Sequence, residues 1–232
     1  MNYVKRKRKL RWIRILIAIG IVFAGTAYLV YPLFTWDTTP QTETIIEETV
    51  TEIGLDYNNN GLSDTQDIIL GARADALARP DYVNAYYDGG YPPDTEGTCT
   101  DLVWRAFMAA GYRLKDMVDA DIAANVSAYP GTWGHPDPNI DFRRVQNLSV
   151  FFKRTAETLT LDVYDTEAWQ AGDIVIFGNN VHIGIVSDIR NENDIPLLLH
   201  NSDQADREED RLEYGSYTSG ITGHYRFISP TK

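Results

Sequence analysis

The residue with the clearest chemical potential in this chain is Cys99, its single cysteine. It lies where a loop rich in glycine and proline meets a segment of regularly spaced apolar residues, and this spacing predicts a helix over 101–111. We expect the sulfur in the first turn, where unpaired backbone N–H groups and the helix dipole favour the thiolate. Cys99 is therefore a candidate nucleophile, although a lone cysteine can also serve as a small buried apolar residue.

Two histidines in apolar, strand-like segments can supply the base that a cysteine nucleophile needs. His182 lies in the segment 181–186, and His200 directly follows the segment 196–199. A cysteine, a base and a group that orients the base are the parts of a cysteine hydrolase. We expect His182 to act as the base and either His200 or the adjacent Asn201 to orient it.

The other two histidines fit structural roles better. His135 lies in a His-Pro-Asp-Pro turn, and His224 lies in a late strand. Neither His-x-His nor His-Glu-x-x-His spacing occurs, which disfavours a zinc hydrolase. We therefore expect no cofactor for catalysis.

A twelve-residue segment that begins at Asp56 has the pattern of a calcium-binding loop. Oxygen-bearing side chains occupy positions 1, 3, 5, 9 and 12, a glycine occupies position 6, and the position-7 carbonyl can complete the shell. The expected ligands are Asp56, Asn58, Asn60, Leu62, Asp64 and Asp67. Position 12 is Asp where an EF-hand has Glu, so the loop is more similar to the single loops of dockerin modules. We predict a structural calcium ion; the alternative is an Asn/Asp-rich turn that needs no metal.

The charge of the chain is divided unevenly. Seven of the 21 basic residues precede Ile15, which leaves 14 basic against 33 acidic residues, a net charge of −19, on the remainder. So acidic a region is not expected to bind nucleic acid. Within it, Arg143 and Arg144 form a basic point that suits a substrate carboxylate, or a salt bridge to one of the many acids.

The N-terminal segments predict export and membrane anchoring. A basic cytoplasmic segment, 1–14, precedes twenty uncharged residues, 15–34, which are long enough to span a bilayer as a helix. We expect a single-pass signal anchor with the N-terminus in the cytoplasm and the rest of the chain outside. The alternative is a secreted protein, cleaved after the small residues that end at Ala27. Residues 35–51 read as a polar stalk.

The remainder is long enough for one domain with a core, preceded by the loop-and-helix segment 52–80. Apolar periodicity predicts helices over 68–78, 101–111 and 147–159, and short apolar runs after residue 172 predict strands. The predicted strands are 174–177, 181–186, 196–199 and 221–227. Helices first and strands afterwards predict an α+β domain over 81–232 with a mainly antiparallel sheet.

Several motifs resemble those of the NlpC-type cell-wall cysteine peptidases, which have a papain-like fold. These motifs are Tyr86-Tyr87-Asp88-Gly89-Gly90, Gly172-Asp173-Ile174, His182-Ile183-Gly184-Ile185-Val186 and a strand that ends at His200. The resemblance implies that Cys99 is the nucleophile, His182 the base, His200 its orienting partner and Tyr86 an aid to the oxyanion. One departure is that the peptidases usually read Asp-Cys-Ser-Gly around the nucleophile, whereas this chain reads Thr98-Cys99-Thr100-Asp101.

A closer resemblance, over 56–227, is to the family called domain of unknown function 1287. It is carried by Cys99-Thr100-Asp101, the stretch Pro136 to Arg144, His182 to Asp188, His200-Asn201 and Ile221 to Arg226. We expect Asp101, Arg143, Arg144 and Asn201 to bind substrate.

Together these features predict a membrane-anchored, extracytoplasmic cysteine hydrolase that cleaves an amide bond of peptidoglycan. Two alternatives remain. One is a noncatalytic cell-envelope binding module on the same fold, and the other is a cysteine acyltransferase or esterase with another substrate.

Overall fold

The computed structural model describes residues 55–202, 205–218 and 220–228. The chain divides into two units, Met1–Thr51 and Glu52–Lys232, and the fold below is that of the second. The predicted basic segment 1–14, membrane span 15–34 and stalk 35–51 lie outside the described residues. Within the described ranges, no helix combines the length and apolar character needed to cross a bilayer.

The described residues form helices in the first half of the unit and strands mainly in the second. The helices are α2 (Asp64–Ala78), α3 (Cys99–Ala109), α4 (Leu114–Ala124), α5 (Val145–Thr155) and α6 (Leu212–Thr218). The strands are β1 (Asp81–Tyr82), β2 (Glu96–Gly97), β3 (Glu157–Thr158), β4 (Ile174–Phe177), β5 (His182–Arg190), β6 (Pro196–Leu199), β7 (Glu208–Glu209) and β8 (Ile221–Arg226). Short 3-10 helices cover Val126–Ala128, Pro130–Thr132, Asp141–Arg143 and Thr166–Ala168. This is the predicted α+β class.

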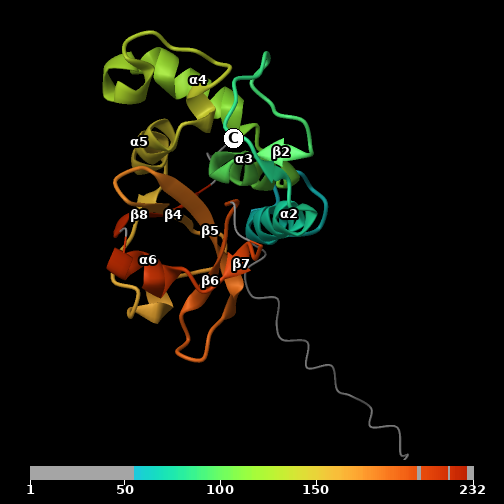
Figure 1. The fold of residues 1–232 in the computed structure, drawn as a ribbon, viewed down its shortest axis with the longest axis vertical. Helices are drawn as coiled ribbons and strands as arrows, with labels where there is room; N and C mark the ends of the chain where they lie inside the picture. The colour runs from blue at the N-terminus through green and yellow to red at the C-terminus, as the bar shows by residue number, and fades with distance from the viewer. Residues whose placement is uncertain (1–54, 203–204, 219, 229–232) are drawn as a thin grey trace, which may run out of the picture. The chain divides into compact units, whose positions relative to one another are not determined.

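Six strands form one antiparallel sheet in the order β3-β8-β4-β5-β6-β7 (Figure 1). The predicted antiparallel sheet is therefore confirmed, and β4 and β6 have the predicted bounds. A separate two-stranded parallel pair, β1-β2, precedes α3 in the chain. The sheet order makes β5 an interior strand between β4 and β6, and its first residue, His182, pairs with Phe177 of β4.

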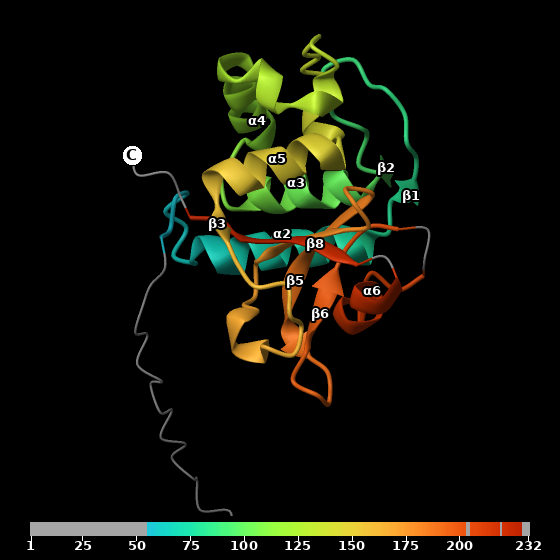
Figure 2. The same ribbon diagram turned by 90° about the vertical axis from the view of Figure 1, so that its left-hand side faces the viewer.

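Both faces of the central sheet are buried. Along β4, Ile174 and Ile176 join the core shared with the helices, whereas Val175 and Phe177 join a second core on the opposite face. This alternation follows from the period of two along a strand. Figure 2 shows α3, α4 and α5 stacked on one side of the sheet. Leu212 of α6 belongs to the second core.

Helix α2 begins four residues earlier than the apolar pattern predicts. Ser63 caps it: the Ser63 hydroxyl accepts the N–H of Gln66 at 3.3 Å, and the Gln66 side chain accepts the N–H of Ser63 at 2.9 Å. Such a capping box starts a helix whatever the apolar pattern of its first turn. Asp64 and Asp67 of the loop therefore belong to the first turn of α2.

Helix α5 is shifted toward the N-terminus relative to its prediction, because the chain turns at Ala156 into β3, whose Glu157 pairs with Arg226. Helices α4 and α6 and strand β7 were not predicted. α4 does have apolar residues at helical spacing, the buried Leu114, Val118 and Ile122, and this signal was overlooked. β7 consists of two glutamates and α6 of seven residues, so their conformation depends on packing against other elements.

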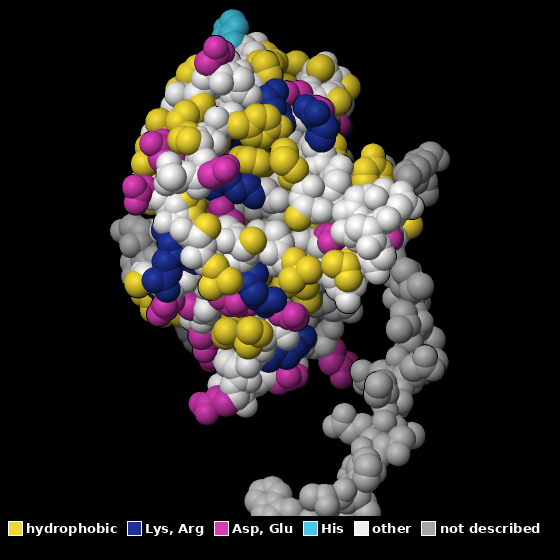
Figure 3. All heavy atoms as spheres, turned by 90° about the vertical axis from the view of Figure 1, so that its right-hand side faces the viewer, with side chains coloured by type: hydrophobic (Ala, Val, Ile, Leu, Met, Phe, Trp, Pro, Cys, Tyr) yellow, Lys and Arg dark blue, Asp and Glu magenta, His cyan; other side chains and the backbone are white. Residues whose placement is uncertain are grey.

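The surface carries both signs of charge in spite of the acidic composition. On the face shown in Figure 3, basic and acidic side chains lie among hydrophobic ones. Ion pairs account for part of this mixture: Arg73 binds Asp188 and Glu208, and Arg154 binds Asp121.

Candidate active site

Cys99 is the first residue of α3, so the structure places its sulfur in the first helical turn, as predicted. Thr98 caps the helix, and its backbone N–H donates to the Asp101 carboxylate at 2.6 Å. The side chain of Cys99 packs into the core shared by the helices and the sheet, where Ile183 of β5 is a neighbour. The nucleophile candidate is thus held between the start of α3 and the start of β5.

The protonation state of Cys99 differs from the prediction. Three backbone N–H groups, those of Ile183, Thr100 and Cys99 itself, favour the thiolate and lower its pKa. Burial has the larger effect and raises the pKa of the thiol to about 11, because a thiolate loses its hydration when only 3% of the residue is exposed. The helix start does not outweigh burial, and Cys99 is a neutral thiol at pH 7 that needs a base.

The two predicted histidines meet at one end of the sheet. Nε2 of His182 lies 2.9 Å from Nδ1 of His200, with the rings nearly perpendicular. His182 is half-buried and His200 is buried. His182 directly precedes Ile183, whose N–H faces the Cys99 sulfur. The His182 ring itself lies 6.1 Å from the ring of Phe177, its partner in β4 on the second-core face. Among the described residues no hydrogen bond joins Cys99 to His182, so a proton transfer between them needs a side-chain movement.

Both histidines are neutral at pH 7. Burial first, and then the positive charges of Arg211 and of His200 when it is protonated, lower the pKa of His182 to about 4. Burial also lowers the pKa of His200, although the Glu209 carboxylate opposes this effect. A neutral imidazole is the form that can accept a proton from a thiol.

Sequence reasoning missed Glu209, which lies in β7 and extends this pair. Its Oε1 is 3.0 Å from Nε2 of His200 and 3.0 Å from Nε of Arg211. The local sequence, Arg207-Glu208-Glu209-Asp210, is uniformly charged and gives no strand signal. Only the pairing of β7 with β6, in which Glu209 stands opposite Leu198, brings the carboxylate to His200.

The structure places His200, rather than Asn201, against the base candidate. Asn201 is fully buried, and neither polar atom of its amide has a hydrogen-bond partner. A methyl group at Gly97 would lie 3.3 Å from Nδ2 of Asn201, so the amide packs closely behind the loop that leads to Cys99. This position is shielded from solvent, which differs from the prediction that Asn201 binds substrate.

Asp101 and Arg143 are also predicted to bind substrate, but in the structure they bind each other. Two hydrogen bonds, of 2.7 and 2.9 Å, join the Arg143 guanidinium to the Asp101 carboxylate, and both side chains are buried. The indole of Trp104 donates to the same carboxylate at 2.8 Å, and Arg143 also donates to the carbonyl of Ala85. A buried, fully bonded pair fixes the loop to α3 and leaves neither charge for a ligand.

Arg144 is partly accessible but is also engaged. Its Nη1 donates to the carbonyl of Gly131 and to Asp141, each at 2.7 Å, and its guanidinium lies 4.6 Å from the ring centre of Trp133. Trp133 itself is 71% exposed. Of the predicted substrate-binding set, Arg144 is thus the member with solvent access.

Tyr86, the predicted aid to the oxyanion, is 59% exposed. Its hydroxyl accepts a hydrogen bond from Nδ2 of Asn139 at 2.9 Å and donates to Asp137 at 3.4 Å. The structure thus attaches the hydroxyl to the 137–139 loop.

The predicted calcium loop closes on itself through side-chain oxygens. Asp56 accepts the N–H groups of Asn60 and Gly61, Asn58 accepts that of Asn60, and Asn60 accepts that of Leu62. A left-handed backbone at Gly61, with φ of 92°, allows the turn.

The last two predicted ligands are engaged by neighbours. Asp67 accepts the amide groups of Asn58 and Asn60 at 2.8 to 3.0 Å, and Asp64 accepts the N–H of Tyr57 and the hydroxyl of Tyr112. Among the residues that the structure describes, no group of three or more His, Cys, Asp or Glu is arranged to hold a metal.

Of the two remaining histidines, His224 has structural surroundings, as predicted. His224 is completely buried, with its ring nitrogens facing Thr160 and Asp173 and its ring stacked on Trp169. His135 is exposed in its turn.

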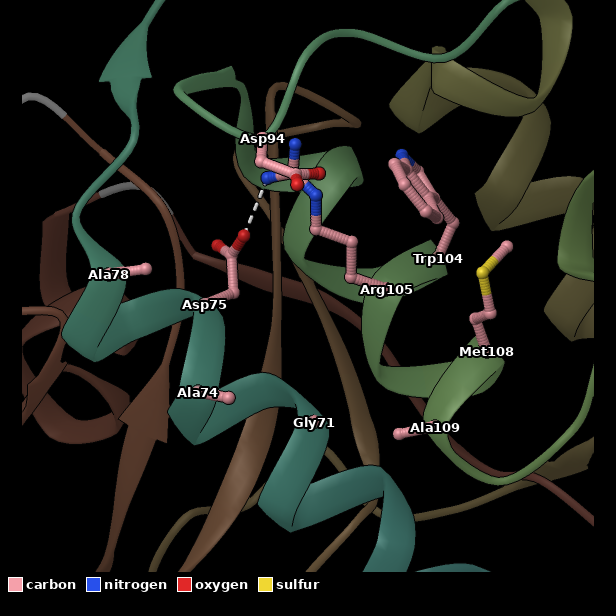
Figure 4. A pocket seen from close by; sticks show the side chains of 9 residues that line it. All are labelled: Gly71, Ala74, Asp75, Ala78, Asp94, Trp104, Arg105, Met108 and Ala109. Carbon is pink, nitrogen blue, oxygen red and sulfur yellow. Dashed lines mark hydrogen bonds and ion pairs between the residues drawn. The ribbon is translucent and has the colours of Figure 1, made fainter.

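A pocket of about 470 Å³ lies between α2 and α3 (Figure 4). Arg105 extends from α3 toward Asp75 of α2 and donates to it at 2.5 Å, and burial raises the pKa of Asp75. A methyl group at Gly71 would lie 2.7 Å from Cβ of Ala109, so the two helices approach closely beside the pocket. Its lining residues include none of the predicted catalytic side chains.

Two comparisons with known proteins found a match. A family described as "Domain of unknown function (DUF1287)" matches residues 69–227. An uncharacterised protein of Escherichia coli strain K12, YijF, is 38% identical over 154 residues, which are 64% of this chain and 73% of that protein. No solved structure matches the chain. The site described above therefore lies within the matched region, and the chain belongs to the DUF1287 family.

Proposed function

We propose that this protein is a membrane-anchored, extracytoplasmic cysteine hydrolase that cleaves an amide bond of peptidoglycan. The observation that supports the chemistry most directly is the hydrogen-bonded pair His182–His200 in the corner where Ile183 contacts Cys99. A thiol, a neutral imidazole to accept its proton and a second imidazole to orient the first are the parts that acyl transfer from an amide requires.

The proposed reaction begins with two neutral groups. His182 accepts the thiol proton as the Cys99 sulfur attacks the amide carbonyl carbon, and a C–S bond forms. Backbone N–H groups at the start of α3 stabilise the resulting oxyanion. The Tyr86 hydroxyl can join them only after it releases Asp137. The protonated His182 then donates to the leaving amine as the C–N bond breaks, which gives a thioester. Water, deprotonated by His182, hydrolyses the thioester and restores the thiol.

The substrate and location rest on the resemblance to NlpC-type peptidases and on the N-terminal sequence. The uncharged segment 15–34 follows seven basic residues, so we propose that it anchors the protein with the domain outside the cytoplasm. Peptidoglycan stem peptides are then the amide polymer within reach. Secretion after cleavage of the segment would leave the same substrate accessible.

One observation favours a second candidate function, a noncatalytic envelope-binding module. Cys99 is only 3% exposed, so a substrate carbonyl reaches the sulfur only after side chains around it move. On a binding module, the same corner would hold a glycan or peptide without cleaving it.

Digestion of purified peptidoglycan distinguishes the two functions. The full chain, purified in mild detergent, is expected to release peptide fragments that mass spectrometry identifies, and Cys99→Ser is expected to release none. Fragment release by Cys99→Ser equal to that of the unmodified chain would contradict the cysteine mechanism. Retention of the chain on peptidoglycan with no fragments from either protein would support the binding module.

We also propose that the 56–67 loop binds calcium in a structural role. The loop already has the turn at Gly61 and oxygen-bearing side chains at the expected positions, and bound calcium would replace the amide contacts of Asn58 and Asn60 to Asp67. Because Asp67 belongs to α2, the ion would fasten this loop to the first turn of the helix.

A further inference from the structure

Three side chains, His182, His200 and Glu209, form a line of hydrogen bonds, which we call the relay. It ends in a carboxylate that no sequence motif indicated. Glu209 Oε1 lies 3.0 Å from His200 Nε2, and His200 Nδ1 lies 2.9 Å from His182 Nε2. The three side chains come from β7, the residue after β6, and the start of β5, which are neighbours in the sheet. The sheet order thus produces a continuous line from the edge strand to the base candidate.

The direction of these hydrogen bonds follows from the chemistry of the last member. An ionised carboxylate can only accept, so Nε2 of His200 must carry the hydrogen. A neutral His200 then has a lone pair on Nδ1, which accepts a hydrogen from Nε2 of His182. The hydrogen of His182 is therefore on Nε2, and its Nδ1 has a free lone pair.

We propose that Glu209 is a positioning residue that fixes both histidines as Nε2–H tautomers, which leaves Nδ1 of His182 as the nitrogen of the pair that is free to accept a proton. This inference deepens the proposed function and rests on it. The carboxylate also balances the positive charge that His182 gains during the reaction. A second histidine without Glu209 would permit either tautomer of the pair.

The other charged groups around the relay do not fix the direction of its hydrogen bonds. Arg211 pairs with Glu209, and Arg207 lies near His200; both are cations that lower the pKa of the histidines. On the facing helix α3, Cys99 is a neutral thiol, and Asp101 is paired with Arg143. Glu209 is the acceptor that contacts an imidazole of the relay.

The neighbouring residue Glu208 supplies a matched control. It is also a glutamate of β7, but its carboxylate accepts from Ser187 at 2.6 Å and from Arg73, away from the histidines. Glu209→Gln and Glu208→Gln therefore make the same chemical change at adjacent residues, and only the first alters the relay.

Nitrogen NMR of the imidazole rings tests the tautomers without requiring activity. The chain has four histidines, so the full-length protein labelled with ¹⁵N-histidine gives an assignable spectrum. We expect His182 and His200 to be Nε2–H tautomers in the unmodified chain and in Glu208→Gln. In Glu209→Gln, whose amide can donate as well as accept, we expect the Nδ1–H form of both to appear. The buried His224 should keep its shifts and so report that each variant is folded.

An Nδ1–H tautomer of His182 in the unmodified chain, or unchanged tautomers in Glu209→Gln, would overturn the proposal. A second readout is the pH profile of kcat/KM on peptidoglycan fragments. Glu209→Gln is expected to lower kcat/KM about tenfold or more, as loss of an orienting partner does elsewhere, and to move the acid limb to lower pH, because loss of the carboxylate lowers the pKa of the relay histidines. Glu208→Gln should match the unmodified chain.

The two readouts separate failure of this inference from failure of the proposed function. If the unmodified chain shows the Nε2–H tautomers but never hydrolyses peptidoglycan, the hydrolase proposal fails and the role of Glu209 in orienting the rings stands. If the chain hydrolyses peptidoglycan and the two glutamine variants have the same pH profile and rate, Glu209 is not a positioning residue.

Discussion

Two histidines of this protein lie in one sheet, and each is connected to a carboxylate, His224 directly and His182 through His200. Their surroundings give the first a structural role and leave the second available for a reaction. His224 of β8 is fully buried, and its two ring nitrogens face the Thr160 carbonyl and the Asp173 carboxylate. His182 of β5 is half-buried and uses Nε2 for His200, which leaves Nδ1 for a reaction partner.

The carboxylates differ in the same way. Asp173 binds both His224 and Arg226 directly, so both of its carboxylate oxygens are occupied by these two side chains. Glu209 reaches His182 only through His200. A histidine saturated on both nitrogens has no lone pair or proton to offer, whereas one at the end of a relay has a defined lone pair. The neighbours of both ring nitrogens therefore indicate function better than the presence of an adjacent acid.

The largest expected effect is on activity, at His182. Replacement by glutamine removes the base, and we expect peptidoglycan hydrolysis to fall by about a thousandfold or more. Thermal unfolding should change little, because the side chain is only half-buried. The exposed His135→Gln variant is the control and should keep full activity. A His182→Gln variant with unimpaired hydrolysis would remove the distinction between the two histidines.

The corresponding change at His224 should act on stability. His224→Gln leaves Asp173 and the Thr160 carbonyl without their partner and removes the ring stacked on Trp169, so we expect a loss of about 3 kcal/mol in the free energy of unfolding. Urea denaturation measures this loss. A loss below about 0.5 kcal/mol, the size typical of surface changes, would show that the cluster is not structural.

The pH dependence of kcat/KM tests the charge state of the active corner. With a pKa of about 4 for His182 and about 11 for Cys99, the free enzyme holds a neutral imidazole and a neutral thiol between these values. We expect kcat/KM to be flat from pH 5 to 9 and to fall about tenfold per pH unit well below 4. A rise centred near pH 6.5 or above would mean that His182 has an ordinary pKa.

Alkylation of Cys99 tests the protonation state of its thiol without substrate. Because burial raises the pKa of the thiol, we expect iodoacetamide to react with the folded chain at pH 7 at least about tenfold more slowly than with the unfolded chain in urea. Mass spectrometry of the modified protein gives both rates. Faster reaction in the folded chain would indicate a stabilised thiolate and contradict the neutral pair.

The smallest expected effect is that of calcium on the 56–67 loop. Calcium at tenfold excess over its Kd stabilises a binding fold by roughly 1.4 kcal/mol, which corresponds to a rise in Tm of about 4 °C for a domain of this size. Scanning calorimetry with calcium and with a chelator measures it. Asp56→Asn should abolish the rise, and an equal rise in that variant would place the ion elsewhere.

The residues themselves predicted the periodic elements well. β4 and β6 have the predicted bounds because Ile-Val-Ile-Phe and Pro-Leu-Leu-Leu are short apolar runs bounded by turn residues. The core of α3 followed from its apolar spacing. α4 was missed although Leu114, Val118 and Ile122 have helical spacing. β7 was missed because two glutamates give no strand signal, and their conformation depends on pairing with β6.

The candidate site was predicted in part. Cys99, His182 and His200 were chosen by type and local setting, and two of the three form a direct hydrogen bond. Asp101 and Arg143 were assigned to substrate, but 42 residues separate them in the chain and they meet as a buried pair. Chain distance hides such pairs, because the mutual neutralisation of two charges depends on a contact that no local pattern encodes.

What the sequence by itself determined is the set of reactive groups and the periodicity that builds α3 and the central strands. Only the tertiary structure decided how those groups are charged and which of them meet. Burial outweighs the helix start at Cys99, strand order brings Glu209 to His200, and Asn201 is excluded from solvent. The physical reason is that side-chain periodicity is local, whereas hydration and hydrogen-bond partners are set by everything that packs around a residue.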